Sequence, residues 1–282
     1  MRNDRPGALG PGRSVAAARR RALAAVLLAA HAALALPAGA QPIDRVAEYR
    51  LELPASDVRD LHQRFTDPQI ALLEKINRAD VSHLQRLPAL VVPLRWMADE
   101  RAYSSAPVFL VSAGTIPKVL VVHQPGQFFA GYEFGRLVRW GPVSTGRASS
   151  PTPDGLFHLN WRSAGRHSTV NPLWFMRWYF NFDNWRGLSL HAYALPGVPA
   201  SHGCIRLLER DAQWLFEWGE EWSVSPDGRR VNTPGTPLWI VGRYDFAAPP
   251  PWRSVEWHRN PVALAPLPIR REPARDEPCR AS

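Results

Sequence analysis

Seven residues in the last third of the chain restrict its fold most, because they require a thiol exposed in a tight turn. Residues 201–207 read Ser-His-Gly-Cys-Ile-Arg-Leu and hold one of only two cysteines in the chain of 282 residues. Gly203 allows the backbone to turn sharply just before Cys204. The residues that follow alternate between apolar and polar, as in a short strand. Cys204 and Arg206 can therefore face a cleft while their neighbours enter a core.

Two histidines precede this thiol, at His202 and His191. A cysteine with a nearby imidazole is the minimum set for thiol catalysis, because the thiolate attacks and the imidazole takes the proton. The competing interpretation is a buried structural cysteine, since free cysteine is among the most buried residue types. The surrounding motif favours a nucleophile at Cys204.

Three blocks of the sequence resemble the L,D-transpeptidase (YkuD-like) family. Residues 200–207 resemble its active-site signature, and residues 190–191 resemble its IHG element. Residues 141–146 and 152–157 together resemble its PVSTG…TPTGTF block. The resemblance implies a mainly β domain, a sandwich or barrel with one helix after the catalytic cysteine, which we place at residues 107–243.

The resemblance also implies roles for the two histidines. The family pairs its cysteine with the histidine of the upstream block, so His191 would be the general base for Cys204. His202 is the alternative base, but side chains two apart on a strand stand roughly 6–7 Å from each other, so we expect it to line the cleft. Ala192 stands where the family often has glycine, and the loop at 194–199 is shorter than usual and holds two prolines.

The neighbours of the thiol have candidate roles in binding. Ser201 can form hydrogen bonds to the backbone or to a substrate, and the N–H groups of Gly203 and Cys204 are candidates for an oxyanion hole. Arg206 can form a bidentate pair with a substrate carboxylate, the alternative being a surface ion pair. The aromatic segment 173–185 could form a dry wall of the cleft, although core and rim packing is the favoured explanation of these aromatic residues. We expect no metal and no organic cofactor.

The function implied by the resemblance is a cysteine acyltransferase that acts on peptidoglycan stem peptides. Cys204 would form a thioester with release of D-alanine, and an amine acceptor would resolve it as a 3-3 cross-link. Two alternatives stay open. One is an L,D-carboxypeptidase or other hydrolase on the same fold, and the other is a non-catalytic module that binds the cell wall.

The N-terminal residues 1–40 predict a secretory signal peptide. An arginine cluster at 19–21 precedes an apolar run at 22–36 and a small-x-small cleavage site at 38–40. The run is shorter than the ~20 residues of a membrane span, so we expect no stable membrane anchor after cleavage. The expected location is therefore outside the cytoplasmic membrane, in the periplasm or cell wall.

The formal net charge of +9 belongs largely to this segment. Residues 1–40 hold six arginines and one aspartate, which leaves the rest of the chain near +4. Such a modest excess does not indicate nucleic-acid binding. It suits an acidic polymer such as a cell wall, although a solvated basic surface without a partner explains it equally.

Residues 41–100 predict a small helical region. The spacing of apolar residues indicates a helix over 67–77 with Asp67 as its N-cap, a shorter helix over 81–87, and a strand over 90–93. Residues 76–93 show a short similarity to the wall-binding LysM module. No first strand is evident, however, and a plain helical appendage is the alternative.

The proline-rich residues 244–282 predict a disordered tail that contains the second cysteine, Cys279. We expect Cys204 to remain a free thiol, since a disulfide would block the nucleophile. Within 107–243, a turn is expected at 135–136 and a helix at 209–221. The expected strands are 108–111, 119–123, 128–134, 137–140, 156–161, 188–191 and 236–241.

Overall fold

The computed structural model describes residues 48–53 and 58–268, which all belong to one compact unit that begins at residue 44. The predicted signal peptide and Cys279 lie outside the described residues. Within the described part, no helix is both long enough and apolar enough to cross a membrane.

A nine-stranded sheet forms the centre of this unit, in the order β6-β13-β3-β4-β5-β10-β9-β8-β7. The pairs β9–β10 and β3–β13 are parallel, and the others are antiparallel. The strands are β3 (Lys118–His123), β4 (Phe128–Glu133), β5 (Arg136–Ser144), β6 (Gly155–His158), β7 (Arg162–His167), β8 (Phe175–Asp183), β9 (Leu188–Ala192), β10 (Ile205–Leu207) and β13 (Pro237–Val241).

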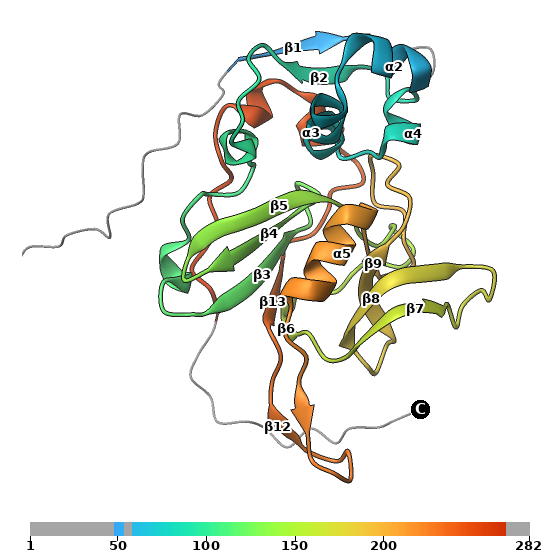
Figure 1. Ribbon diagram of the computed structural model, residues 1–282, viewed down its shortest axis with the longest axis vertical. Helices are drawn as coiled ribbons and strands as arrows, with labels where there is room; N and C mark the ends of the chain where they lie inside the picture. The colour runs from blue at the N-terminus through green and yellow to red at the C-terminus, as the bar shows by residue number, and fades with distance from the viewer. Residues whose placement is uncertain (1–47, 54–57, 269–282) are drawn as a thin grey trace, which may run out of the picture. The chain divides into compact units, whose positions relative to one another are not determined.

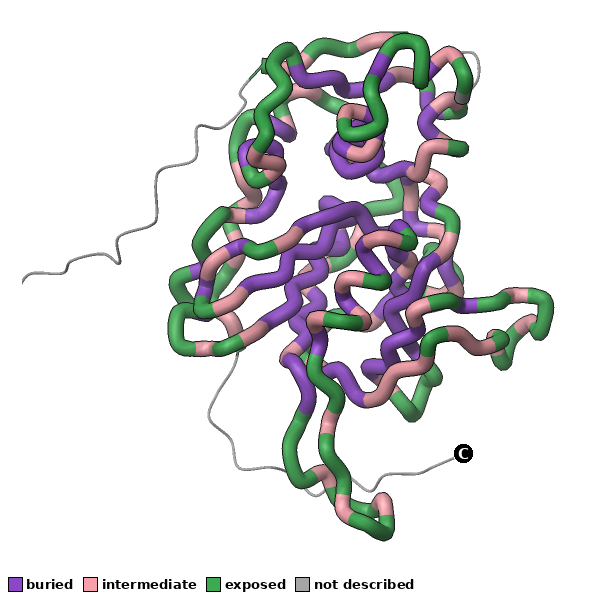
Figure 2. Tube along the Cα trace, in the orientation of Figure 1, coloured by how far each residue is buried: buried purple, intermediate pink, exposed green. Residues whose placement is uncertain are grey.

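The sheet curls around one helix, α5 (Glu209–Trp218), which follows β10 directly. Figure 1 shows α5 lying between the half formed by β3–β5 and the half formed by β7–β9. Its buried face contributes Ala212 and Leu215 to a core that also takes Phe129, Phe180 and Leu190 from the strands. Buried residues concentrate along the sheet, as Figure 2 shows, because both halves pack against the helix. The predicted class is confirmed: mainly β, with one helix after Cys204 and a small helical region before the sheet.

Several predicted element bounds shift in the structure. The segment 108–111 is not a strand: Phe109 forms only an isolated bridge with Arg136, and a 3-10 turn, η2, covers Val111–Ala113. Phe109 is 48% exposed and Val111 80% exposed, and Leu110 is the buried residue of this segment. The β4–β5 turn lies one residue earlier than predicted, since both Phe134 and Gly135 have positive φ.

Several strands were not predicted from the sequence, including the paired strands β7 and β8. The strand β7 reads Arg-Ser-Ala-Gly-Arg-His, which lacks strand-forming residues, and it exists because it pairs with the aromatic β8. The short strands β11 (Ser223–Val224) and β12 (Val231–Thr233) form a separate, largely exposed hairpin (Figures 1 and 2).

The N-terminal region has its own small core. It contains β1 (Tyr49–Glu52), α2 (Val58–Arg64), α3 (Asp67–Asn77), α4 (Val81–Leu84), β2 (Leu90–Pro93) and the 3-10 turn η1 (Glu100–Tyr103). The strand β1, which pairs antiparallel with β2, was not predicted from the sequence. The N-cap of α3 is Thr66 rather than Asp67, and its N–H donates to Gln69 Oε1 at 2.9 Å. The helix α4 ends at Leu84, three residues before the predicted end.

Residues 244–268 correct the prediction of a tail that is disordered from 244 onward. They form two 3-10 turns, η3 (Pro251–Arg253) and η4 (Glu256–His258), and the side chain of Trp252 is fully buried. The His258 ring contacts the Trp252 carbonyl at 2.8 Å, and the Val262 N–H donates to the Ser105 carbonyl at 2.7 Å. Burial of one large aromatic ring outweighs the proline-rich composition of this segment.

Candidate active site

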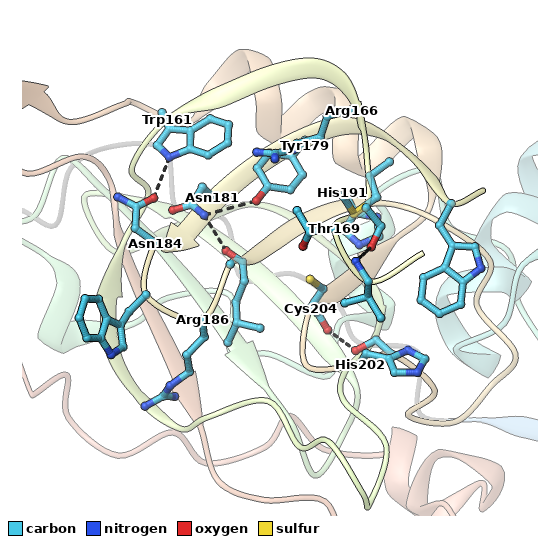
Figure 3. A pocket seen from close by; sticks show the side chains of 18 of the residues that line it. Trp161, Arg166, Thr169, Tyr179, Asn181, Asn184, Arg186, His191, His202 and Cys204 are labelled. Carbon is cyan, nitrogen blue, oxygen red and sulfur yellow. Dashed lines mark hydrogen bonds between the residues drawn. The ribbon is translucent and has the colours of Figure 1, made fainter. Parts of the chain in front are cut away.

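Cys204 lines a pocket of about 630 Å³ that extends along β7, β8 and β9. Figure 3 shows Cys204, His191 and His202 toward one end of this pocket, and Trp161, Asn184 and Arg186 toward the other. The lining residues are Trp161, Arg166, Ser168, Thr169, Val170, Trp174, Met176, Tyr179, Asn181, Asn184, Trp185, Arg186, Gly187, Leu188, His191, Tyr193, Ser201, His202, Cys204, Arg206, Trp222, Val224 and Gly228.

A network of short hydrogen bonds fixes the turn that carries the thiol. Gly203 has a φ of +106°, and a Cβ there would lie 3.0 Å from Leu188 Cδ2, so any other residue would be strained at this position. The Thr152 hydroxyl donates to the Gly203 carbonyl at 2.9 Å, and the Ser201 hydroxyl donates to the Cys204 carbonyl at 2.5 Å. Cys204 is a free, half-buried thiol immediately before β10. The turn therefore presents the sulfur in one orientation.

A second hydroxyl reaches the thiol from the neighbouring strand. Ser189 on β9 donates to Cys204 Sγ at 3.6 Å and is itself fully buried. Sequence reasoning missed this residue. The available signal was its position two residues before His191, which places both side chains on the same face of β9.

His191 lies on β9, opposite Arg206 in the parallel β9–β10 register. Its Nδ1 contacts the Ala192 carbonyl at 3.1 Å. A carbonyl can only accept a hydrogen bond, so Nδ1 carries the proton and Nε2 is the basic nitrogen. Burial, together with the nearby Arg206 charge, lowers the pKa of His191 to about 4, against the opposing effect of the Ala192 contact. The imidazole is therefore neutral at pH 7 and able to accept a proton.

His202 lines the rim of the same pocket, as the sequence predicted for the alternative base. Its ring packs against Trp174 with the ring centroids 5.0 Å apart. Partial burial and the charges of Arg147 and Arg206 lower its pKa below the ordinary value. His202 thus offers a packing surface at the entrance, whereas the buried His191 offers a fixed basic nitrogen.

The predicted oxyanion hole needs a correction. The Gly203 N–H donates to the Ser201 hydroxyl at 3.1 Å, within a turn in which Gly203 has a positive φ. This donor is engaged within the turn, so Gly203 stabilises the turn, whereas Ser201 both stabilises the turn and lines the pocket. The Cys204 N–H remains as the candidate from the predicted pair.

The pocket carries a positive charge that sequence reasoning found only in part. Arg166, Arg186 and Arg206 line it, and in the described part of the chain no aspartate or glutamate is among its lining residues. The half-buried guanidinium of Arg206 lies over the Tyr193 ring at 4.7 Å, and burial lowers its pKa. Carboxylate-bearing ligands suit such a pocket. Within residues 48–53 and 58–268, no cluster of three or more His, Cys, Asp or Glu side chains could hold a metal ion.

Comparison with known proteins supplies one family match. Residues 117–240 match the model of the YkuD family, described as the L,D-transpeptidase catalytic domain. A search of curated proteins gives no match.

Solved structures of L,D-transpeptidases align with part of the chain. An LD transpeptidase, LdtMt1, in complex with imipenem aligns at 23% identity over 44% of this chain and 59% of its own, with a TM-score of 0.36. An L,D-transpeptidase (Yku) from Stackebrandtia nassauensis aligns at 22% identity over 45% and 57%, with a TM-score of 0.37. L,D-transpeptidase 1 from Mycobacterium tuberculosis aligns at 26% identity over 45% and 62%, with a TM-score of 0.34. The alignment covers less than two thirds of each of these structures.

Proposed function

Because residues 117–240 match the model of the YkuD L,D-transpeptidase catalytic domain family, we propose that this protein is an exported cysteine acyltransferase acting on peptidoglycan stem peptides. One observation carries the proposal. A free thiol on a fixed glycine turn lies in a pocket with a buried neutral imidazole and three arginines, and none of the described residues that line this pocket is a carboxylate. Such a pocket suits acyl transfer from an anionic peptide.

Acylation is the first half of the proposed reaction. The Cys204 thiol gives its proton to His191 Nε2, and the sulfur attacks the carbonyl carbon of the third stem residue. The Cys204 N–H donates a hydrogen bond to the resulting oxyanion. The tetrahedral intermediate then collapses: the C–N bond to D-alanine breaks, and the proton on His191 passes to the leaving nitrogen. A thioester and free D-alanine remain.

Transfer to an acceptor is the second half. His191 Nε2 takes a proton from the amine of a neighbouring stem, whose nitrogen attacks the thioester carbonyl. The C–S bond breaks, an amide bond forms, and the proton returns to the sulfur. Transfer exceeds hydrolysis where the pocket orients the amine, since orientation can supply effective molarities of about 10⁵ M or more. The apolar side chains of Trp174 and Met176 in the pocket wall favour this outcome over attack by water.

Arg206 and His191 have different roles in this scheme, the first in substrate binding and the second in proton transfer. The guanidinium of Arg206 receives a carboxylate of the donor stem and so holds the scissile carbonyl near the thiol. His191 remains neutral above its pKa of about 4, so it is ready to act as a base at any pH where the wall is assembled. The contact of its Nδ1 with the Ala192 carbonyl keeps Nε2 as the nitrogen that takes up and returns the proton.

The deciding experiment incubates the protein with a muropeptide that carries a tetrapeptide stem and follows the products by mass spectrometry. The proposal predicts a thioester on Cys204, free D-alanine, and dimers joined between two third-position residues. The matched control is Cys204→Ala, which should give none of these. Tripeptide monomer alone, with acceptor in excess, would indicate the L,D-carboxypeptidase. Binding without any thioester would indicate the non-catalytic wall-binding module.

A further inference from the structure

One peptide group of the loop between β9 and β10 lies between two charged side chains. The Leu195 N–H donates to Asp80 Oδ2 at 2.7 Å. The carbonyl of Ala194, which belongs to the same peptide group, accepts from Arg206 Nη1 at 3.4 Å. The carboxylate of Asp80 comes from the N-terminal region, and the guanidinium of Arg206 lines the pocket beside the thiol.

We propose that Asp80 is a positioning residue that orients Arg206 in the pocket through the Ala194–Leu195 peptide. The role of Arg206 as the group that receives the donor carboxylate rests on the proposed function. The positioning itself rests on the contacts alone. It gives the N-terminal region a task in the catalytic domain, although residue 80 is far from the thiol in sequence.

The carboxylate of Asp80 is held rigidly on its own side. It caps α4, where Oδ1 accepts from the Ser82 hydroxyl at 2.6 Å, from the His83 N–H at 3.1 Å and from His83 Nδ1 at 2.8 Å. Burial raises the pKa of Asp80, but the hydrogen bonds from Ser82, His83 and Leu195 outweigh burial and lower it below the ordinary value. Asp80 is therefore charged at neutral pH. One oxygen serves the helix cap and the other serves the loop.

The loop is tied to Asp80 at more than one atom. The Asp80 N–H donates to the Leu195 carbonyl at 3.0 Å, and Ala79 forms an isolated bridge with Pro196. The Leu195 side chain is fully buried. The peptide that ends at Leu195 therefore has little freedom to rotate, and its carbonyl points steadily toward Arg206.

The region that carries Asp80 is itself anchored to the catalytic domain. Arg210 at the start of α5 pairs with the buried Glu74 at 2.5 Å and donates to the Ala71 carbonyl at 3.0 Å. The fully buried Arg78 donates to the Gly126 carbonyl at 2.9 Å. These contacts fix α3 and the start of α4, so the Asp80 carboxylate forms a stationary support.

The electrostatics of this arrangement are mutually reinforcing. The peptide N–H faces an anion and its carbonyl faces a cation, so each charge polarises the peptide in the direction that strengthens the other hydrogen bond. Arg206 otherwise rests on the ring of Tyr193, which restrains the plane of the guanidinium but not its rotation within that plane. A hydrogen bond to the Ala194 carbonyl selects one rotation, which a bidentate carboxylate contact requires.

The test uses Asp80→Ser in the full-length protein. Serine is also a good N-cap, so α4 keeps its cap, but the shorter side chain cannot reach the Leu195 N–H. The matched control is Ser82→Ala, which removes a hydrogen bond to Asp80 Oδ1 and leaves the Oδ2 contact with the loop in place.

Two readouts need no substrate. Hydrogen exchange at the Leu195 amide should become at least tenfold faster in Asp80→Ser and stay within twofold of wild type in Ser82→Ala. The NMR signal of the Arg206 guanidinium should shift in Asp80→Ser and not in the control. Unchanged exchange at Leu195, or an unchanged Arg206 signal, would overturn the positioning role.

A binding cycle measures what the orientation does for a ligand. The Kd for a stem tetrapeptide is measured in Cys204→Ala protein, which removes the chemistry. Asp80→Ser should raise Kd about tenfold, as expected for the weakening of one charged hydrogen bond. In protein that also carries Arg206→Lys, Asp80→Ser should raise the Kd by less than twofold, because lysine lacks the bidentate guanidinium that Asp80 is proposed to orient. Full additivity would show that Asp80 affects binding independently of Arg206 and would refute the proposal. Failure of the acyltransferase function would appear separately, as wild-type protein that forms no thioester while the Leu195 and Arg206 readouts still respond.

Discussion

The buried imidazole of His191 makes the stability of this protein depend on pH in a way that one variant can isolate. Its pKa is about 4 in the folded chain and 6.5 in an exposed histidine. Between these values the unfolded state binds the proton and the folded state does not. The stability that this group contributes is therefore complete above pH 6.5 and is lost as the pH falls toward 4.

The expected magnitude follows from the same two values. At 1.36 kcal/mol for each pKa unit, the step from 6.5 to about 4 corresponds to about 3 kcal/mol of unfolding free energy. His191→Gln removes the titrating ring. His123, whose pKa burial and Arg78 also lower to about 4, titrates in both proteins and cancels in the comparison.

Urea denaturation at pH 7 and at pH 4 measures this effect in wild type and in His191→Gln. Wild type should lose about 3 kcal/mol more than the variant over this interval. If both proteins lose the same amount, His191 does not titrate with a lowered pKa. His191 would then not be a neutral buried base, and His202 would become the better candidate for the general base.

Four further outcomes are expected. Cys204→Ala should abolish thioester formation in the mass spectrum while the melting temperature stays within a few degrees of wild type. His191→Ala should slow acylation by about 10²–10⁴-fold in stopped-flow kinetics, and His202→Ala by less than tenfold; equal losses would mean that the base is wrongly assigned. Gly203→Ala should cost about 1–2 kcal/mol in chemical denaturation, since its φ of +106° strains any side chain. The exported protein should begin at Gln41 by intact mass, whereas a full-length species in the membrane fraction would contradict cleavage.

The sequence alone was sufficient to predict those elements whose conformation depends on residues that are adjacent in the chain. The strand β2 has the predicted bounds, because a run of apolar β-formers between prolines leaves little choice. The helix after the cysteine follows from its amphipathic spacing, and the sharp turn at Gly203 from the freedom of glycine. Cys204 and His191 were identifiable because the motifs that carry them are local.

Tertiary structure alone decided the remaining features of the site. Ser189 reaches the thiol only because β9 and β10 are parallel neighbours, and Arg166 enters the pocket only because β7 pairs with β8. The neutral state of His191 depends on burial, which is a property of the packed chain and not of the residue type. The contact of Asp80 with Leu195 joins positions 115 residues apart. Local patterns report on the propensities of a segment. Hydrogen bonds between distant residues, and the removal of charges from water, arise only when the segments pack together.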